Sequence, residues 1–246
     1  MTVFDHPVCS PRSFVLAGAL LFAGLAAPLP LAPADAAEPA SSEEPFKLAR
    51  IYWEYNASAN DLGVHVTLDA EDWKRLRIEK PGGQSLFEVR GRGPYQQLGM
   101  TELFFEGAEP SLSQVPLATL LGRFPEGLYC FEGVTVDGGE LESEVPFSHA
   151  VPAGPVVSAV FSAPSSLTIH WDEVTTTPPG FPVRPLTISG YQVICGSFQV
   201  TLPPTARSVT VPPEFVASLP AGENPYEVLA IEQSANQTLT EGVFVK

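Results

Sequence analysis

The sequence is poor in positive charge. Its 246 residues include 13 lysines and arginines against 28 aspartates and glutamates, which gives a formal net charge of −15. A chain this acidic repels phosphate backbones and anionic lipid headgroups, so neither nucleic acid nor a charged membrane surface is an expected partner. Acidity of this size also favours solubility, and we expect a monomer.

Residues of the kind that carry chemistry are sparse too. No Gly-x-Ser-x-Gly elbow is present to hold a nucleophile. His65, His149 and His170 are far apart, and none has a second histidine at ligand spacing, which leaves zinc unsupported. Paired carboxylates of the glycosidase kind need a deep cleft, which small β-sandwiches rarely have. We expect no enzyme, no catalytic residue, no metal site and no cofactor.

The longest apolar run is too short to cross a membrane. Residues 14–27 form an uncharged run of 14 residues, whereas a membrane span needs about 20. Three prolines follow, and Ala34-Asp35-Ala36 has the small-x-small pattern that signal peptidase accepts. We interpret residues 1–37 as a cleaved signal peptide, with an uncleaved anchor as the alternative. The mature protein is then periplasmic or extracellular and has no stable membrane span.

Proline and glycine are frequent and scattered, and this predicts the fold class. The 26 prolines and 20 glycines separate short apolar runs, as is typical of short strands joined by tight turns. Residues 38–46 are acidic and rich in proline and serine, so we expect a flexible tether. The remaining length suits two domains of roughly 100 residues each. We predict an all-β protein with two tandem β-sandwich domains, at 47–150 and 154–246.

Alternation and turn residues predict the elements of the first domain. Residues 48–55 are aromatic and β-branched, which indicates a strand, and 56–61 form a turn cluster. Apolar Val64, Val66 and Leu68 alternate with polar residues, as in a half-buried strand. The further expected elements are a strand end at 76–78, a hairpin turn at 81–83, strands at 86–89 and 100–106, and a helical turn at 116–121.

A tyrosine follows a proline–glycine turn in each half of the chain. Pro125-Glu126-Gly127 precedes Tyr129, and Pro220-Ala221-Gly222 precedes Tyr226. In immunoglobulin-like sandwiches, a tyrosine at this corner donates its hydroxyl hydrogen to the backbone a few residues upstream. The shared pattern predicts an immunoglobulin-like sandwich for residues 47–150 as well.

Residues 154–246 resemble a fibronectin type III module. The segment Leu167-Thr168-Ile169-His170-Trp171-Asp172 is similar to the second strand of that family, whose tryptophan anchors the core. Tyr191-Gln192-Val193 is similar to the third strand, and residues 226–232 are similar to the strand that carries the corner tyrosine. The resemblance implies six or seven strands packed around Trp171. Such modules are spacers and binding platforms in many proteins, so the fold names no function.

Two cysteines, Cys130 and Cys195, remain after the proposed cleavage. Export exposes thiols to oxidation, which leaves a disulfide between the two domains open. The family match places Cys195 on the core face with Tyr191 and Val193, while Cys130 has the opposite parity to Tyr129. A core thiol cannot easily reach another domain, so we favour two unpaired thiols.

Two groups of acidic and amide side chains flank the second expected strand. Asn56, Asn60 and Asp61 precede it, and Asp69, Glu71 and Asp72 follow it. The two ends of a strand lie about 17 to 20 Å apart, so the two groups are not expected to converge. Their spacing does not match an EF-hand, and a solvated turn is favoured over a calcium site around Asn60 and Asp61. The sequons at Asn56 and Asn236 are interpreted as turn residues.

Exposed aromatic rings are the remaining functional signal. Ile51, Trp53 and Tyr55 share one face of the first strand and Tyr52 takes the other, so at least one ring is expected to face outward. Such a ring can anchor a partner protein or stack on a sugar, or it can pack between the domains. The favoured function is a non-enzymatic exported interaction or structural protein that presents two β-sandwiches to a protein partner. The alternative is a carbohydrate- or calcium-binding module of the cell envelope.

Overall fold

The computed structural model describes residues 44–246, and it is built mostly of strands. The expected signal peptide, residues 1–37, and residues 38–43 of the expected tether lie outside this range. Three short helices occur within it: α1 (Pro94–Leu98), α2 (Leu117–Arg123) and α3 (Pro213–Ser218). None of the helices between residues 44 and 246 has the length and apolarity of a membrane span. The expected all-β class is confirmed.

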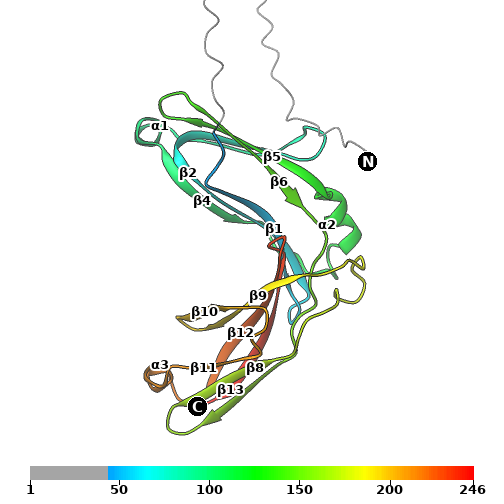
Figure 1. Cartoon of the computed structure of the whole chain (residues 1–246), viewed down its shortest axis with the longest axis vertical. Helices are drawn as coiled ribbons and strands as arrows, with labels where there is room; N and C mark the ends of the chain where they lie inside the picture. The colour runs from blue at the N-terminus through cyan, green and yellow to red at the C-terminus, as the bar shows by residue number, and fades with distance from the viewer. Residues whose placement is uncertain (1–43) are drawn as a thin grey trace, which may run out of the picture.

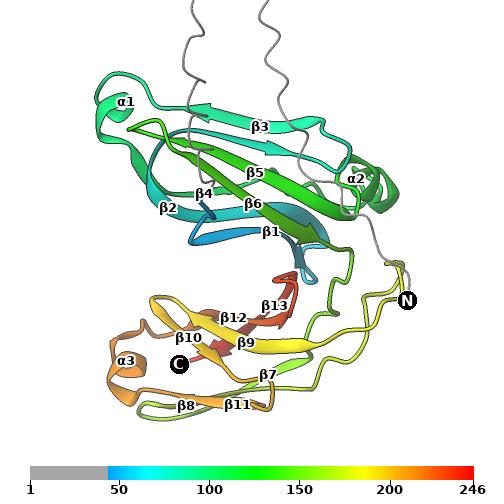
Figure 2. The ribbon, with the colours of Figure 1, turned by 45° about the horizontal axis from the view of Figure 1, so that its top comes forward.

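One mixed sheet of ten strands runs through the whole molecule, in the order β10-β9-β12-β13-β1-β2-β5-β6, with β3 and β4 also paired to β2. A second sheet has three strands in the order β11-β8-β7. The strands are β1 (Leu48–Asn56), β2 (Asp61–Glu79), β3 (Ser85–Arg90), β4 (Met100–Glu106), β5 (Gly127–Thr135), β6 (Glu140–Phe147), β7 (Val157–Ser162), β8 (Ser166–Trp171), β9 (Ile188–Cys195), β10 (Phe198–Leu202), β11 (Ser208–Val211), β12 (Glu223–Glu232) and β13 (Gln237–Val245). The molecule is curved, with β4, β2 and β1 on the inner side of one arm and β10, β9 and β12 on the inner side of the other (Figures 1 and 2).

The long strand β2 organises the first arm. Its first part pairs with β1 and β4, and its second part pairs with β3 and β5. Register shifts on either side of Trp73 bend the strand between these two pairings. Trp53, Trp73 and Phe131 fill the core that the bent strand encloses. A bulge of this kind lets a strand turn a corner without ending.

This bend corrects the expectation for the second acidic group. Asp69, Glu71 and Asp72 lie within β2, not in a loop after a strand. Glu71 and Asp72 are exposed because the strand changes partners there, so their charged side chains face water while the backbone stays extended. The start of the fold also differs from the expected boundary at residue 47, since Phe46 is buried in the first core and Glu44 bridges to Leu141 of β6.

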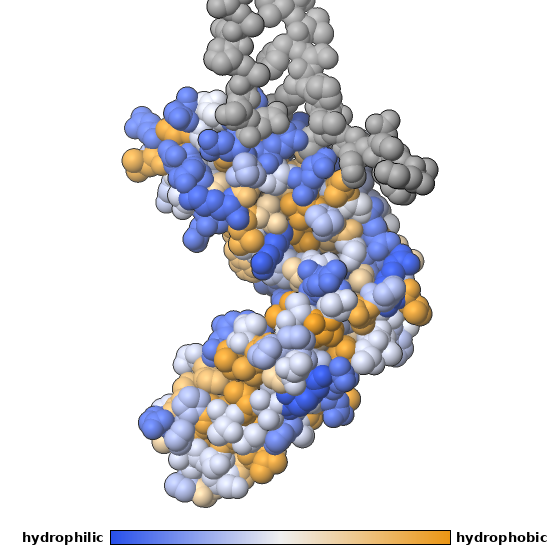
Figure 3. All heavy atoms as spheres, viewed as in Figure 1, coloured by the Kyte–Doolittle hydropathy of each residue, from blue (hydrophilic) through white to orange (hydrophobic). Residues whose placement is uncertain are grey.

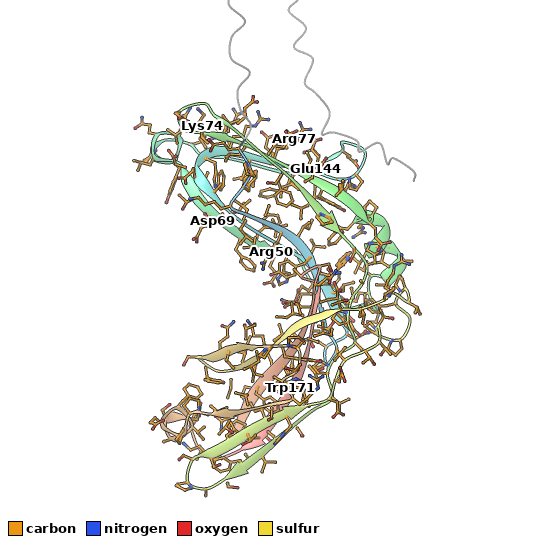
Figure 4. All side chains as sticks on the ribbon, in the orientation of Figure 1. Arg50, Asp69, Lys74, Arg77, Glu144 and Trp171 are labelled. Carbon is orange, nitrogen blue, oxygen red and sulfur yellow. The ribbon has the colours of Figure 1, made fainter. Side chains whose placement is uncertain are left out.

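The second arm is a sandwich of seven strands, β7 to β13. The sheet of β7, β8 and β11 covers one face of β10, β9, β12 and β13. Trp171 lies in its core with its ring centroid 5.5 Å from that of Tyr191, and Figure 4 shows Trp171 within this arm. Val193 and Cys195 share that core, as the resemblance implied.

The two tyrosine corners differ. The hydroxyl of Tyr129 donates to the carbonyl of Pro125 at 3.1 Å, which confirms the expected corner in the first arm. In the second arm the ring of Tyr226 packs directly over Gly242, where an added Cβ would lie 2.2 Å from the ring. The turn is tied instead by the side-chain amide of Asn224, which donates to the carbonyls of Pro220 at 3.1 Å and Gly222 at 2.9 Å.

The arms are joined through the main sheet itself. Strands β1 and β13 pair in parallel, with Glu54 opposite Gln237. Phe181, from the connection between β8 and β9, packs its ring 4.9 Å from that of Tyr55 in the first core. Each arm has its own hydrophobic core, but the expected division at residues 150–154 does not separate the arms into independent sheets.

Asn236 is the polar centre of this junction. Its side chain is fully buried, and its Oδ1 accepts the backbone N–H of Trp53 at 2.8 Å. Its Nδ2 donates to the carbonyls of Ser148 at 2.9 Å and Ala150 at 3.3 Å. Asn236 lies in the turn between β12 and β13, as interpreted, and its buried side chain in addition links backbone groups of both arms.

A second polar contact at the junction involves Glu126. Its carboxylate accepts the backbone N–H of His149 at 2.7 Å and pairs with the guanidinium of Arg184 at 2.6 Å. Burial opposes ionisation of Glu126, but the hydrogen bond from His149 and the pairing with Arg184 outweigh it and lower the pKa of the carboxyl. The ion pair therefore ties the turn before β5 to the segment before β9.

Candidate functional site

The candidate site is the open sheet face on the inside of the curve, called here the concave face. It is formed by the side chains of β4, β2, β1, β13, β12, β9 and β10 that point away from the two cores. The strand registers connect it across the molecule, with Tyr52 opposite His65, Glu54 opposite Gln237, and Leu229 between Leu239 and Gln192. In the space-filling view the hollow between the arms stays open, and hydrophilic surface lies beside apolar patches along it (Figure 3).

Negative charge gathers on the concave face. Among the strand residues of the described chain that point to the concave face, Arg50 carries the positive charge. Figure 4 shows Arg50 with Asp69 on the inner side of the first arm. The carboxylates on or over this face are those of Glu54, Asp69, Glu102, Glu106, Glu109, Glu223, Glu227 and Glu241. The face therefore carries a large excess of negative charge.

Two aromatic rings accompany these carboxylates. Phe104 of β4 is 58% exposed, and Tyr52 of β1 is half-buried. Both rings pack on the imidazole of His65, with centroid distances of 5.3 Å from Tyr52 and 5.8 Å from Phe104. Trp53 and Tyr55 lie in the first core instead. The expectation that one ring of the first strand faces outward is confirmed by Tyr52.

Three ionisable side chains meet at the middle of the concave face, and we call Glu54, His65 and Glu109 the His65 cluster. The Nε2 atom of His65 lies 3.0 Å from Oε1 of Glu109, and its Nδ1 atom lies 3.9 Å from Oε2 of Glu54. One ligand atom from each residue falls within 4.8 Å of the other two. His65 is 4% exposed although it has the outward parity expected for it, because side chains from neighbouring elements cover it.

Local sequence explains how Glu109 reaches this position. Gly107 follows β4 and donates its backbone N–H to the carbonyl of Val64 at 2.9 Å, which holds the chain against β2. Gly63 then leaves room on the sheet face, since a Cβ there would lie 2.5 Å from Cγ of Glu109. The carboxylate of Glu109 occupies the space that any other residue at position 63 would fill.

Burial and like charge set the protonation of this region. Burial raises the pKa of Glu54, and Glu109 and Glu106 raise it further, while His65 and the hydrogen bond from Gln237 act in the opposite direction. Burial likewise raises the pKa of Glu227, with Glu241 and Glu54 adding to the effect. Desolvation and repulsion therefore both disfavour the ionised forms of Glu54 and Glu227, and a bound cation would relieve both.

The other predicted site residues serve the fold. The side-chain oxygen of Asn56 accepts the backbone N–H groups of Ser58 at 2.9 Å and Ala59 at 3.0 Å. The side-chain oxygen of Asn60 accepts the hydroxyl hydrogen of Tyr55 at 3.0 Å. These bonds close the turn between β1 and β2, in agreement with the turn predicted at these residues.

Glu71 and Asp72 of the second acidic group lie elsewhere, whereas Asp69 lies on the concave face. Glu71 and Asp72 line a shallow pocket of about 390 Å³ together with Asp137 and Glu140. Lys47 pairs with Glu71 at 2.6 Å. The acidic residues on the two sides of Val64, Val66 and Leu68 therefore do not form one site.

The cysteines do not bridge the arms. Cys195 is a free thiol in the second core, and burial raises its pKa. Cys130 lies in β5 of the first arm. The expectation that Cys130 and Cys195 do not pair with each other is confirmed, but the prediction of two unpaired thiols is wrong, because Cys130 is disulfide-bonded.

Comparison with known proteins shows a distant likeness in structure alone. No protein-family model and no curated protein matches the chain. A segment of two fibronectin type III domains from chicken tenascin is 15% identical, with 82% of this chain and 99% of that chain covered and a TM-score of 0.27. The fibronectin(III)-like modules of CbhA from Clostridium thermocellum are 11% identical, with 80% and 90% covered and a TM-score of 0.27.

A third similar structure is the spore cortex lytic enzyme SleM of Clostridium perfringens. It is 17% identical, with 39% of this chain and 28% of that chain covered and a TM-score of 0.31. The chain thus spans about a quarter of that enzyme. The similar structures include β modules of the fibronectin type III kind, and the likeness concerns the fold alone.

Proposed function

We propose that the protein is a non-enzymatic, exported binding protein whose concave face holds a cationic segment of a partner protein. The observation that carries the proposal is the charge of this face, where eight carboxylates accompany Arg50. Complementary charge speeds encounter and selects among partners more than it adds raw affinity. A partner rich in lysine and arginine relieves the repulsion among the carboxylates and gains their attraction.

The aromatic rings favour the same partner. Phe104 is exposed and Tyr52 is half-buried beside carboxylates. A lysine or arginine side chain over such a ring gains about 0.5 to 1 kcal/mol at an exposed site, while its charged end reaches a carboxylate. A contact of this kind combines the two features that the concave face offers.

The junction makes the concave face a preformed surface. The pairing of β1 with β13 and the bonds of Asn236 connect the inner strands of both arms. A surface whose backbone is already ordered loses less conformational entropy when a partner binds. The rigid junction therefore supports a role in binding.

The test is titration of the purified protein with a fluorescent lysine-rich peptide, followed by anisotropy, with a glutamate-rich peptide of equal length as the comparison. We expect binding of the basic peptide and a fall in its affinity as salt is raised, since exposed charges are screened over about 10 Å at 0.1 M salt. The double variant Glu106→Gln/Glu227→Gln should bind the basic peptide about twofold to thirtyfold more weakly, because each of the two charge pairs contributes roughly 0.2 to 1 kcal/mol.

The matched control is Glu144→Gln. Glu144 is exposed on β6, on the outer side of the first arm (Figure 4). Equal weakening by the control variant, or equal binding of the acidic peptide, would refute the proposed face. Salt-independent binding of a neutral glycan would favour the carbohydrate-binding alternative. Turnover of an ester, peptide or glycoside that one point mutation abolishes would overturn the non-enzymatic assignment.

A further inference from the structure

We propose that Glu54, His65 and Glu109 form a binding site for one divalent transition-metal ion, with Zn²⁺ as the probe. The inference concerns the His65 cluster itself and does not depend on the partner of the concave face. It rests on the positions of three donor atoms, on their chemistry and on the groups that hold them.

The donor atoms are close to the arrangement that a zinc ion needs. Zinc binds histidine nitrogen and carboxylate oxygen at about 2.0 to 2.2 Å in tetrahedral geometry, which places neighbouring donors roughly 3.3 Å apart. In the His65 cluster Nε2 lies 3.0 Å from Glu109 and Nδ1 lies 3.9 Å from Glu54, so the two carboxylates face different ring nitrogens, while one donor atom from each residue falls within 4.8 Å of the other two. For one ion to bind all three side chains, the carboxylate of Glu54 or of Glu109 has to turn toward the ring nitrogen that the other carboxylate faces.

The donor types select the metal. One imidazole and two carboxylates suit zinc and its neighbours among the transition metals, whereas calcium and magnesium prefer sites made of oxygen alone. Three protein donors leave one tetrahedral position for water or another ligand. The side chains of Glu54 and Glu109 are 17% and 25% exposed, while that of His65 is 5% exposed, so the fourth position would face the hollow.

The surroundings hold the donors in place. Gln237 of β13 donates a hydrogen bond from its side-chain amide to the carboxylate of Glu54. Gly63 gives Glu109 its place on the sheet face, and the rings of Tyr52 and Phe104 flank the imidazole. Groups that orient the ligands of a metal typically change its affinity by about tenfold to a hundredfold. Glu106 on the neighbouring strand adds negative charge that attracts a cation.

The experiment is calorimetric titration of Zn²⁺ into the chelator-treated full chain, compared with the variants His65→Gln and Glu109→Gln. We expect wild type to bind one more ion per chain than His65→Gln, and Glu109→Gln to bind that ion at least about tenfold more weakly. His170→Gln is the matched control, because His170 is exposed on β8 and lies outside the cluster. The comparison of wild type with His65→Gln and Glu109→Gln also cancels binding by the other histidines and the cysteines, which these three chains all retain.

A second variant separates loss of the site from loss of the fold. Gly63→Ala keeps all three donors but places a Cβ 2.5 Å from Cγ of Glu109, so the Glu109 side chain has to shift from its present position. It should weaken zinc binding while the thermal unfolding midpoint in chelator stays near that of wild type. Zinc binding that is equal in wild type, His65→Gln and Gly63→Ala would overturn the proposal, as would a wild-type chain that binds no zinc. Peptide binding measured in chelator is unaffected by either result, so the failure of one proposal is distinguishable from the failure of the other.

Discussion

Replacing Asn236 with alanine tests the junction between the arms. The side chain is fully buried and bonds the backbone N–H of Trp53, which is itself fully buried, and the carbonyls of Ser148 and Ala150. Alanine removes every one of these bonds and offers no replacement. The N–H of Trp53 is then left buried without a partner, and the carbonyls of Ser148 and Ala150 are left partly buried.

The expected loss can be worked from these contacts. A buried polar group that loses its partner costs about 1 to 3 kcal/mol. The donor of Trp53 and the acceptors at Ser148 and Ala150 together predict a fall of about 3 kcal/mol in the free energy of unfolding, since carbonyl oxygens tolerate partial loss better than N–H groups do. A fall of this size is a large part of the roughly 5 to 15 kcal/mol that stabilises a typical domain.

The assay is urea unfolding of the purified protein followed by tryptophan fluorescence. Asn56→Ala is the control with exposed hydrogen bonds, because the Asn56 amide also links the arms, through Glu241 at 2.8 Å, and its oxygen closes the turn between β1 and β2. The control should lose about 1 kcal/mol. A loss below about 1 kcal/mol for Asn236→Ala, at an unchanged m value, would refute the reasoning and show that the junction relaxes or admits water.

Two further predictions concern single side chains. Tyr129→Phe removes the corner bond and should lower the free energy of unfolding by about 1 kcal/mol, whereas Tyr226→Phe should lower it less because another side chain ties that turn; urea midpoints of the two variants check the difference. Glu126 has a lowered pKa, so its pairing with Arg184 stabilises the fold above the carboxyl's ordinary value of 4.5, and this contribution is lost as the pH falls through the lowered value. Glu126→Gln should therefore flatten the decline of stability in acid, measured as the thermal midpoint from neutral pH downward, and an unchanged slope contradicts the assignment.

Alternation and turn residues in the sequence predicted the parts of the fold that depend on neighbouring residues in the chain. The strands around Trp53 and Trp171, the hairpin at residues 81–83 and the helical turn near residue 117 all appear in the structure. In each case the pattern of apolar residues or the turn residues themselves determine the backbone. The corner at Tyr129 followed from the same kind of local signal.

Contacts between distant segments could not be predicted in this way. Parity placed His65 on the correct face but gave no sign that Glu109, on a separate segment, would cover it. Ligand spacing along the chain does not indicate the His65 cluster, because its three side chains come from three separate segments. The acidic stretch at residues 69–72 has the composition of a loop, and the bulge that keeps it in β2 depends on pairing with β4 and β5. The local signal for this contact is Gly63, a residue without a side chain two positions before the outward-facing His65, which leaves room on the sheet face.

The parallel pairing of β1 with β13 has a consequence for the order in which the fold can form. A ribosome delivers β13 after every other strand of residues 44–246, yet this strand lies in the middle of the main sheet, between β12 and β1. Until β13 has emerged, β1 and β12 both present open edges that can pair with other chains. The edge of β1 in the first arm therefore stays unpaired until the last strand is available. A chain truncated before residue 237 loses the strand that joins its two arms.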